Sequence, residues 1–391
     1  MKIALWLSLF IAFYTYVGYG ILLFIIIKIK RALKGRKIVT DIADDLLPEC
    51  TLVVAAYNEE HFITEKIANS LALNYPAGKL KLVFVTDGSA DRTPEIISQY
   101  PQIQLLHRPE RAGKIAAVHR AMEYVHTEVV IFTDANTFLN PEAITRICRH
   151  YADRTVGAVA GEKRVQIDAN ADASAAGEGF YWKYESALKK WDSELYSVVG
   201  AAGELFSVRR DLYQDVPADT VLDDFMISML IAAQGYRILY EPDSYALETA
   251  SENVTEELKR KIRIAAGGIQ SILRLKPLLF SFKYPILSFQ YVSHRVLRWT
   301  VTPFFLILAF ITNFALAFAE MGLVYELLFA GQVLFYLLAL LGFVMEKRQI
   351  RIKVLFIPYY FCVMNYAVLA GIIRYFTKKQ SSVWEKVQRK Q

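Results

Sequence analysis

The sequence predicts an α/β fold in which a cytoplasmic domain with a Rossmann-like, largely parallel sheet is flanked by transmembrane helices. From Thr51 onward, short apolar runs alternate with amphipathic stretches, a pattern typical of strands and helices in a sheet covered on both faces. Long apolar segments lie near both ends of the chain, at Ile3–Ile27 and at about 299–376. Each is longer than the roughly 20 residues that cross a hydrocarbon core.

The first apolar segment has 25 residues, which favours a retained anchor over a cleaved signal peptide, because no small-x-small cleavage site precedes the basic run. Six basic residues follow between Lys28 and Lys37, and such a cluster marks the cytoplasmic side of a span. We therefore expect residues from about 38 to 295 to be cytoplasmic. The net charge of +6 alone would also suit a nucleic-acid partner, but the place of the cluster favours the lipid bilayer and no nucleic acid is expected.

The C-terminal apolar stretch divides into three blocks, at about 300–319, 322–345 and 353–375. Three crossings would place the basic tail outside, against the positive-inside tendency, so a re-entrant or interfacial last block is the alternative. We expect four spans in total. The predicted division is an N-terminal transmembrane helix, a basic juxtamembrane linker, a cytoplasmic domain, an interfacial segment, about three transmembrane helices and a basic tail (1–28, 29–50, 51–275, 276–298, 299–376 and 377–391).

Polar residues follow the predicted strands at the points where these strands end. The first strand, Thr51–Ala56, is followed by Tyr57-Asn-Glu59, and the second ends in Thr-Asp87-Gly. Because the carboxyl ends of parallel strands meet at one edge of a sheet, these residues are candidates for a ligand crevice. For Asp87, hydrogen bonding to a base or ribose and an ordinary strand-turn-helix connection are both open at this point.

The strand Val129–Thr133 ends in Asp134-Ala-Asn136, which places two oxygen ligands two residues apart. Such oxygens can hold a hard divalent cation that shares its shell with phosphates, although turns favour Asp and Asn for backbone reasons too. Lys114 opens a predicted helix after Arg111-Ala-Gly. That position suits a phosphate or the acidic strand ends, and a solvated basic turn is the alternative.

Two adjacent carboxylates, Asp223 and Asp224, lie at a predicted helix start. Helix capping explains one of them, and the other could act as a base in a partly desolvated cleft. Further on, Lys259–Arg274 projects as an amphipathic helix with a basic face that would meet either headgroups or a leaving diphosphate. For Ser293–Trp299 we favour anchoring at the membrane interface by Arg and Trp.

These motifs together resemble the membrane-bound family 2 glycosyltransferases, the superfamily of cellulose synthase, hyaluronan synthase and poly-N-acetylglucosamine synthase. The resemblance runs from about Thr51 to Gln270 and more loosely through the spans. The order and spacing of the motifs make it far more specific than any one of them. The matching stretches are Val-Ala-Ala56-Tyr57-Asn-Glu59-Glu, Thr-Asp87-Gly-Ser-Ala-Asp-Arg-Thr, Arg-Ala-Gly-Lys114, Thr-Asp134-Ala-Asn136, Leu-Asp223-Asp224-Phe and Gly235-Tyr-Arg-Ile-Leu-Tyr-Glu-Pro.

The resemblance implies a GT-A nucleotide-diphospho-sugar domain, a Mg²⁺ or Mn²⁺ ion, inversion at the anomeric carbon and a place in the bacterial inner membrane as a multi-pass protein. It implies Asp224 as the catalytic base beside Asp223, and Asp134 with Asn136 as the metal ligands. The implied donor-binding residues are Ala56, Tyr57, Glu59, Asp87, Lys114, Asp134, Arg260 and Arg263. Gly203 and Glu204, with Asp223, would border the acceptor.

One departure from the family pattern bears on the product. Where processive synthases have Gln-x-x-Arg-Trp, this chain has Arg260-Lys-Ile-Arg263 followed by Ile-Ala-Ala-Gly-Gly, without the Trp that stacks on an acceptor sugar. We expect transfer from a nucleotide-diphospho-sugar to a growing exopolysaccharide. Single addition to a lipid-linked acceptor is the alternative, and a non-catalytic nucleotide-sugar-binding subunit is a third hypothesis. Four spans are few for a translocation channel, which favours self-association or an accessory export subunit.

Overall fold

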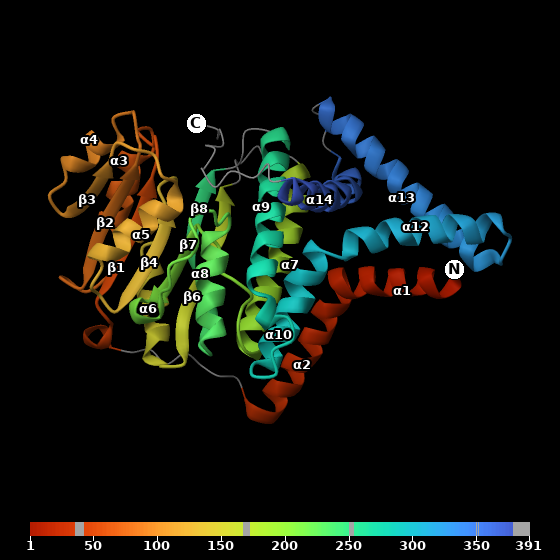
Figure 1. The fold of residues 1–391 in the computed structure, drawn as a ribbon, viewed down its shortest axis with the longest axis horizontal. Helices are drawn as coiled ribbons and strands as arrows, with labels where there is room; N and C mark the ends of the chain where they lie inside the picture. Colours follow the sequence, from red (N-terminus) through yellow and green to blue (C-terminus); the bar gives the residue numbers. More distant parts are fainter. Residues whose placement is uncertain (36–42, 167–172, 250–253, 349, 351, 378–391) are drawn as a thin grey trace.

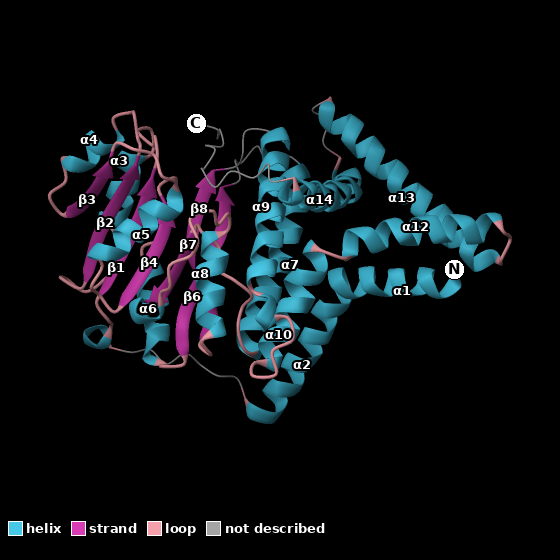
Figure 2. Cartoon of the chain, viewed as in Figure 1, coloured by secondary structure: helices cyan, strands magenta, loops and turns pink. Residues whose placement is uncertain are grey.

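The computed structural model describes residues 1–35, 43–166, 173–249, 254–348, 350 and 352–377. An eight-stranded sheet with its covering helices lies at one end of the molecule, and a group of apolar helices lies at the other (Figure 1). Two long helices, α7 (Ala173–Leu195) and α9 (Val254–Arg274), stand between them. Figure 2 shows the same division, with the strands confined to one end and helices alone at the other.

The sheet has the strand order β3-β2-β1-β4-β7-β6-β8-β5. Its first four strands are parallel, as the alternation of strands and helices predicted. The second half is mixed, because β7 runs antiparallel to both of its neighbours, β4 and β6, while β6 and β8 are parallel. The strands are β1 Cys50–Ala56, β2 Leu80–Asp87, β3 Ile103–Arg108, β4 Val129–Asp134, β5 Thr137–Leu139, β6 Val156–Gln166, β7 Leu205–Arg209 and β8 Arg237–Thr249.

Alternate residues of β1 enter two separate hydrophobic cores. Val53 packs on one face of the sheet with residues of α5 and α8, and Val54 packs on the other face with residues of α3, α4 and α6. Both faces of the strand are apolar because both are covered, which explains its continuous apolar run. The covering helices are α3 Ile63–Leu71, α4 Thr93–Ser98, α5 Lys114–Tyr124, α6 Ala143–Arg149 and α8 Asp223–Ala233, and short 3₁₀ helices lie at Asp44–Leu46, His150–Ala152, Arg210–Leu212 and Lys276–Leu278.

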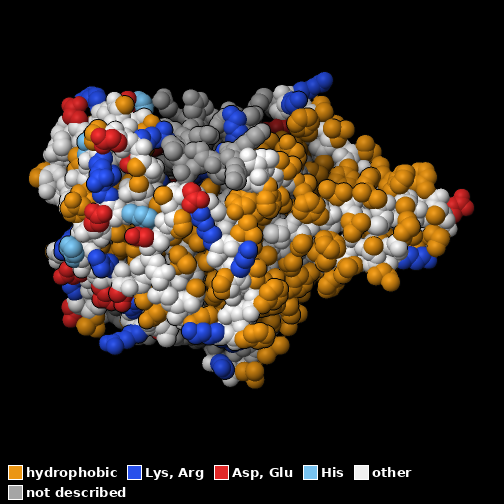
Figure 3. Space-filling view, in the orientation of Figure 1, with side chains coloured by type: hydrophobic (Ala, Val, Ile, Leu, Met, Phe, Trp, Pro, Cys, Tyr) orange, Lys and Arg blue, Asp and Glu red, His pale blue; other side chains and the backbone are white. Residues whose placement is uncertain are grey.

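Among the described residues, three helical stretches are long and apolar enough to cross a membrane: Lys2–Lys34, Leu323–Lys347 and Val354–Phe376. The pair Pro285–Trp299 and Thr302–Phe318, bent by 59°, makes up to four if it counts as one span. Figure 3 shows hydrophobic side chains covering this end of the molecule. The helices are α1 Lys2–Phe13, α2 Tyr19–Lys34, α10 Pro285–Tyr291, α11 Leu297–Trp299, α12 Thr302–Phe318, α13 Leu323–Lys347 and α14 Lys353–Phe376, with π-helical turns at Tyr14–Gly18 and Val292–Val296.

The predicted N-terminal span ends at residue 28, but α2 continues to Lys34. The first part of the basic cluster that begins at Lys28 is therefore helical. Arg36 and Lys37 of that cluster lie outside the described residues, as do residues 378–391 of the predicted basic tail. In Figure 1, α14 is seen almost along its axis, whereas α1 and α12 run across the view. The last apolar helix therefore lies at a steep angle to α1 and α12.

Candidate active site

The carboxylate of Asp87, at the end of β2, holds the turn that precedes α5. Its Oδ2 accepts hydrogen bonds from the backbone N–H groups of Ala112 (2.8 Å) and Gly113 (2.6 Å). Its Oδ1 lies 3.6 Å from the Arg120 guanidinium and accepts no hydrogen bond from the described residues. A buried carboxylate oxygen without a donor leaves room for a hydrogen bond from a ligand.

A cleft opens beside Asp87 between the ends of β1 and β2 and the start of α5. The Arg111 guanidinium lies 3.9 Å from the centre of the Tyr57 ring at its border. The lining residues are Ala55, Ala56, Tyr57, Asp87, Arg111, Gly113, Lys114 and Ala117. Four predicted donor-binding residues thus lie together here. Another predicted donor-binding residue, Glu59, is buried with its N–H donating to Thr93 and does not line this cleft.

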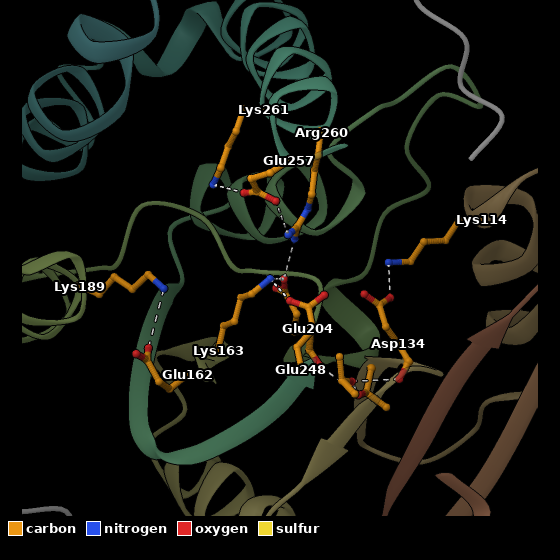
Figure 4. A network of polar contacts seen from close by, with 12 residues as sticks. Lys114, Asp134, Glu162, Lys163, Lys189, Glu204, Glu248, Glu257, Arg260 and Lys261 are labelled. Carbon is orange, nitrogen blue, oxygen red and sulfur yellow. Dashed lines mark hydrogen bonds and ion pairs between the residues drawn. The ribbon is translucent and has the colours of Figure 1, made fainter. Parts of the chain in front are cut away.

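Lys114 connects this cleft with Asp134, at the end of β4, and with Asp223, at the start of α8. Its Nζ lies 2.8 Å from Asp134 Oδ1 and 3.7 Å from Asp223 Oδ2 (Figure 4 draws the contact with Asp134). Burial alone would lower the pKa of Lys114, but Asp134 and Asp223 raise it above its ordinary value. The ammonium therefore stays charged, as a cation that meets a diphosphate must.

Asp134 and Asn136 were predicted to hold a divalent cation, and the donor set fits one in part. Asn136 is 7% exposed, and its Oδ1 is buried with no hydrogen-bond partner in the described part of the chain. An amide oxygen near a carboxylate is a suitable ligand pair for Mg²⁺ or Mn²⁺. Within the described residues, no group of three or more His, Cys, Asp or Glu side chains could hold a metal, so further ligands would have to come from a substrate.

Asp223 and Asp224 begin α8, and neither side chain caps it, because the N-cap position belongs to Leu222. The capping interpretation of one of these acids is therefore wrong. Asp224 Oδ1 accepts a hydrogen bond from its neighbour's N–H, that of Phe225 (2.8 Å). Burial and the adjacent charge of Asp223 raise the pKa of Asp224 to about 7, against the opposing effect of Lys114. A carboxyl group in this state can accept a proton near neutral pH.

Gly203 lies directly beside this acid. A Cβ atom there would be 3.3 Å from Asp224 Oδ2 and 3.4 Å from Lys114 Nζ, so any larger side chain would enter the space in front of both groups. That space is where an acceptor hydroxyl would have to lie if Asp224 is the base. The glycine thus keeps the carboxylate accessible.

The predicted acceptor residue Glu204 and the predicted donor residue Arg260 pair with each other (Figure 4). Arg260 Nη2 lies 3.2 Å and Lys163 Nζ 2.6 Å from Glu204 Oε1, and Lys163 also contacts Glu248. Burial would raise the pKa of Glu204, but Lys163 and Arg260 hold it well below its usual range. Sequence reasoning missed Lys163 and Glu248, because both lie in the charged later parts of β6 and β8, where no apolar pattern marks a strand.

Lys259–Arg274 was predicted to present a basic face to headgroups or to a diphosphate. At the C-terminal end of the helix this face instead contacts other residues of the protein. Gln270 Oε1 accepts from the Val221 N–H (3.0 Å), and Arg274 binds the carboxylate of Asp219 at 2.7 Å. A Cβ on Gly267 would approach Leu222 to 2.8 Å. This part of α9 therefore packs on the segment that leads into Asp223. Arg263 lies nearly one turn beyond Arg260 on the same helix.

The anchoring role favoured for Ser293–Trp299 is wrong for its charged residues. The His294 side chain is fully buried, 2.6 Å from Asp192 and 3.2 Å from Glu185 of α7. Arg295 and Arg298 contact Glu185 at 2.8 Å and 3.1 Å. Burial would raise the pKa of Glu185, but Arg295 and His294 hold it well below its usual value. Sequence gave no sign of these acids, which lie about 100 residues earlier.

Comparisons with known proteins identify the domain that contains this site. Residues 51–216 match the family described as glycosyl transferase family 2. Poly-beta-1,6-N-acetyl-D-glucosamine synthase of Staphylococcus aureus (strain COL) is 27% identical over 244 residues, which cover 60% of this chain and 58% of that protein. The Staphylococcus epidermidis synthase is 24% identical over 234 residues, covering 57% and 55%. The chain thus spans somewhat more than half the length of the curated relatives it matches.

A solved structure matches nearly the whole chain. The mannosyltransferase PcManGT from Pyrobaculum calidifontis, in complex with GDP-Man and Mn²⁺, superposes with a TM-score of 0.73 at 24% identity, covering 96% of this chain and 99% of that one. At this identity the likeness concerns the fold. The fold and the family match define a GT-A glycosyltransferase domain. Residues 51–216 thus form a family 2 glycosyltransferase domain, as the resemblance predicted, apolar helices accompany it, and the predicted fold class is confirmed.

Proposed function

We propose that the protein is an inverting, metal-dependent glycosyltransferase at the inner membrane. It moves a sugar from a nucleotide-diphospho-sugar to a growing extracellular polysaccharide, with its GT-A domain in the cytoplasm. The observation that supports this most is the contact of Lys114 with both Asp134 and Asp223, beside the Asp87 cleft and the raised pKa of Asp224. These groups come from four separate segments and meet at one edge of the sheet.

The donor would lie with its nucleoside in the Asp87 cleft and its diphosphate beside Lys114. The unused Oδ1 of Asp87 suits a base or ribose donor group. We place Arg260 and Arg263 near the diphosphate as well, because both belong to the N-terminal half of α9, where Arg260 contacts Glu204. The names of the Staphylococcus relatives and their N-acetylglucosamine polymer support a polysaccharide product for this chain.

Asp134 and Asn136 would hold the Mg²⁺ or Mn²⁺ ion, with the remaining ligands from the diphosphate. The orphaned Asn136 oxygen supports this assignment, and Mn²⁺ accompanies GDP-Man in the similar mannosyltransferase. A bound divalent cation would neutralise the charge that grows on the leaving diphosphate. Lys114 adds a fixed positive charge to the same place.

Asp224 would act as the base in a single displacement. Its carboxylate takes the proton of the acceptor hydroxyl as that oxygen forms a bond to the anomeric carbon. On the opposite side the bond from that carbon to the diphosphate oxygen breaks, and the electron pair leaves with the nucleoside diphosphate. The space in front of Gly203 provides access for the acceptor, and Asp223 keeps the base near neutral pKa.

Incubating the purified protein in lipid with a panel of nucleotide sugars, and measuring released nucleoside diphosphate, tests the class of reaction. Asp224→Asn should lose transfer and keep donor binding. Equal activity in Asp224→Asn would refute the base assignment. Absence of turnover with every donor and acceptor, together with intact donor binding, would favour the non-catalytic subunit instead.

A second candidate function is single addition to a lipid-linked acceptor. One observation favours it: no Trp follows Arg260 and Arg263 where the processive synthases have Gln-x-x-Arg-Trp. Product length separates the two. A ladder of products in membranes would support polymerisation, and one lipid-soluble product would support single addition. Self-association or an accessory export subunit remains part of the polymerisation proposal.

A further inference from the structure

Lys66 places an ionisable amine in an apolar core. It lies on α3, is 0% exposed, and its helix neighbours Ile63 and Ile67 belong to the core on that face of the sheet. Its Nζ donates to Thr133 Oγ1 (3.1 Å) and to the carbonyl oxygen of Thr137 (2.6 Å). It has no ion pair within 4.0 Å in the part of the chain that the structure describes.

A buried amine whose direct partners are a hydroxyl and a carbonyl is costly to charge, because no described carboxylate lies at ion-pair distance to compensate its desolvation. The burial lowers the pKa of Lys66 to about 7, against the opposing attraction of Asp134. An apolar side chain of similar length would fill the same core without that cost. Stability alone therefore does not explain a lysine at this position.

The two partners of Lys66 lie on either side of one turn. Thr133 precedes Asp134 at the end of β4, and Thr137 follows Asn136 at the start of β5. The two hydroxyl oxygens are 3.1 Å apart, and Thr137 Oγ1 donates to the Asp134 carbonyl (3.0 Å). Thr133 Oγ1 also donates to the carbonyl of Glu204 (2.9 Å), beside Gly203. Lys66 thus forms, from the core side, hydrogen bonds to the residues at both ends of the three-residue turn Asp134–Asn136.

We propose that Lys66 is a positioning residue that fixes the Asp134–Asn136 turn and thereby sets the affinity of this turn for a divalent cation and the diphosphate bound to it. The identity of the ligand rests on the proposed function, whereas the restraint on the turn does not. Groups that orient metal ligands typically contribute about 10- to 100-fold to metal affinity. The ligands themselves would be Asp134 and Asn136, and Lys66 would touch neither substrate nor metal.

Lys66→Met tests this, with Lys66→Arg as the charge-conserving variant. Lys79→Met is the matched control, because Lys79 Nζ also donates to two backbone carbonyls, those of Asp45 and Leu47, on the outside of the domain. Three quantities are measured in purified full-length protein: thermal unfolding, Mn²⁺ affinity in the presence of a nucleoside diphosphate, and hydrogen exchange of the peptide that covers residues 129–140.

We expect Lys66→Met to unfold at the same or a higher temperature, to bind Mn²⁺ about 10- to 100-fold more weakly, and to exchange faster at the turn. Lys66→Arg should recover part of the affinity, and Lys79→Met should match the wild type in Mn²⁺ affinity and turn exchange. Lower stability with unchanged Mn²⁺ affinity would show a purely structural lysine and overturn the proposal.

If Lys66→Met does not fold, Thr133→Val keeps the shape of the side chain and removes the hydroxyl that Lys66 binds. Folded Thr133→Val with wild-type affinity and exchange would also overturn the proposal. If the wild type itself binds no divalent cation, the metal in the proposed function fails. Faster turn exchange in Lys66→Met would then still support the restraint, and unchanged exchange would refute it.

Discussion

At the scale of single residues, the site holds a lysine that stays charged close to a carboxyl group whose pKa is near neutral. Lys114 is held charged by Asp134 and Asp223, whereas Asp224 is shifted toward the protonated form by burial and by Asp223. One acid, Asp223, thus raises the pKa of both groups, which keeps the ammonium of Lys114 charged and makes the carboxyl group of Asp224 harder to ionise. A buried group whose pKa is shifted toward neutrality by a neighbouring charge is typical of functional sites.

The rate of transfer should therefore depend on pH through Asp224. The base works when deprotonated, so the rate should rise as pH increases through about 7. In Asp223→Asn the neighbouring negative charge is lost, and the rising limb should move to lower pH. Rate profiles of both proteins measure this, with Asp215→Asn, an exposed acid, as the control. A limb that stays in place in Asp223→Asn would contradict the role given to Asp223.

The same shift has a consequence for stability. Because the pKa of Asp224 is raised in the folded protein, its contribution to stability is fully present at pH values below the pKa that it has in the unfolded chain. This contribution is lost as pH rises through about 7. Asp224→Asn should consequently be more stable than the wild type at pH 8, by roughly 1–3 kcal/mol, with the difference disappearing near pH 4. Denaturant unfolding at both pH values measures it. A constant difference at the two pH values would contradict the assigned shift.

At the scale of elements, α9 approaches its neighbours through two glycines. A Cβ on Gly267 would be 2.8 Å from Leu222, and one on Gly268 would be 2.6 Å from the Trp299 ring. Trp299 in turn packs on Phe225 at 5.4 Å, next to Asp224. The position of Asp223 and Asp224 at the start of α8 therefore depends on how closely α9 and Trp299 pack.

Gly268→Ala should displace α9 or Trp299 and cost about 1–3 kcal/mol of stability, with reduced transfer. Gly331→Ala in α13 is the control, because a Cβ there would have no described atom of another residue within 4 Å outside its own helix backbone. Trp299→Leu should relieve the clash, so the double variant should lose less than the sum of the two single losses. Unfolding and transfer assays on the four proteins measure this, and strictly additive losses would contradict the contact.

The elements also show what a sequence can predict. The ends of β1, β2 and β4 were predictable, because a buried strand that stops at an acid is a local pattern, and Asp87, Lys114 and Asp134 do come together. The antiparallel direction of β7 was not predicted, since strand direction depends on pairing between distant segments. Likewise Lys66 looked like an ordinary residue of an amphipathic helix, and only the fold reveals its burial behind the turn.

At the scale of the whole molecule, a buried ionic cluster joins the glycosyltransferase domain to the apolar helices. Glu185 of α7 faces His294, Arg295 and Arg298, and Asp192 accepts from Tyr19 of α2 and from Gln290. Glu185 thus contacts all three basic side chains, and Asp192 shares His294 with it. Removing a partner from a buried group of charges costs far more than removing an exposed pair.

Glu185→Gln should therefore destabilise the protein by about 3–5 kcal/mol, because it leaves buried cations without compensation. Glu194→Gln is the matched control on the same helix: its partner Arg31 is 32% exposed, and the loss should be at most about 1 kcal/mol. Thermal unfolding in detergent compares the two. Equal losses would mean that the junction is more open to water than its burial indicates.

The close approach of α14 to α9 links the active site to the lipid around it. A Cβ on Gly371 would lie 2.5 Å from Ala265 Cβ and 2.8 Å from the backbone nitrogen of Ala266, so the two helices meet with no side chain between them. Side-chain rotamers cannot absorb a tilt of α14 at such a contact. A change in acyl-chain length changes the tilt of an apolar helix in a bilayer. A changed tilt of α14 would then displace α9 and, through it, the acids at the start of α8, so sugar transfer would respond to membrane thickness.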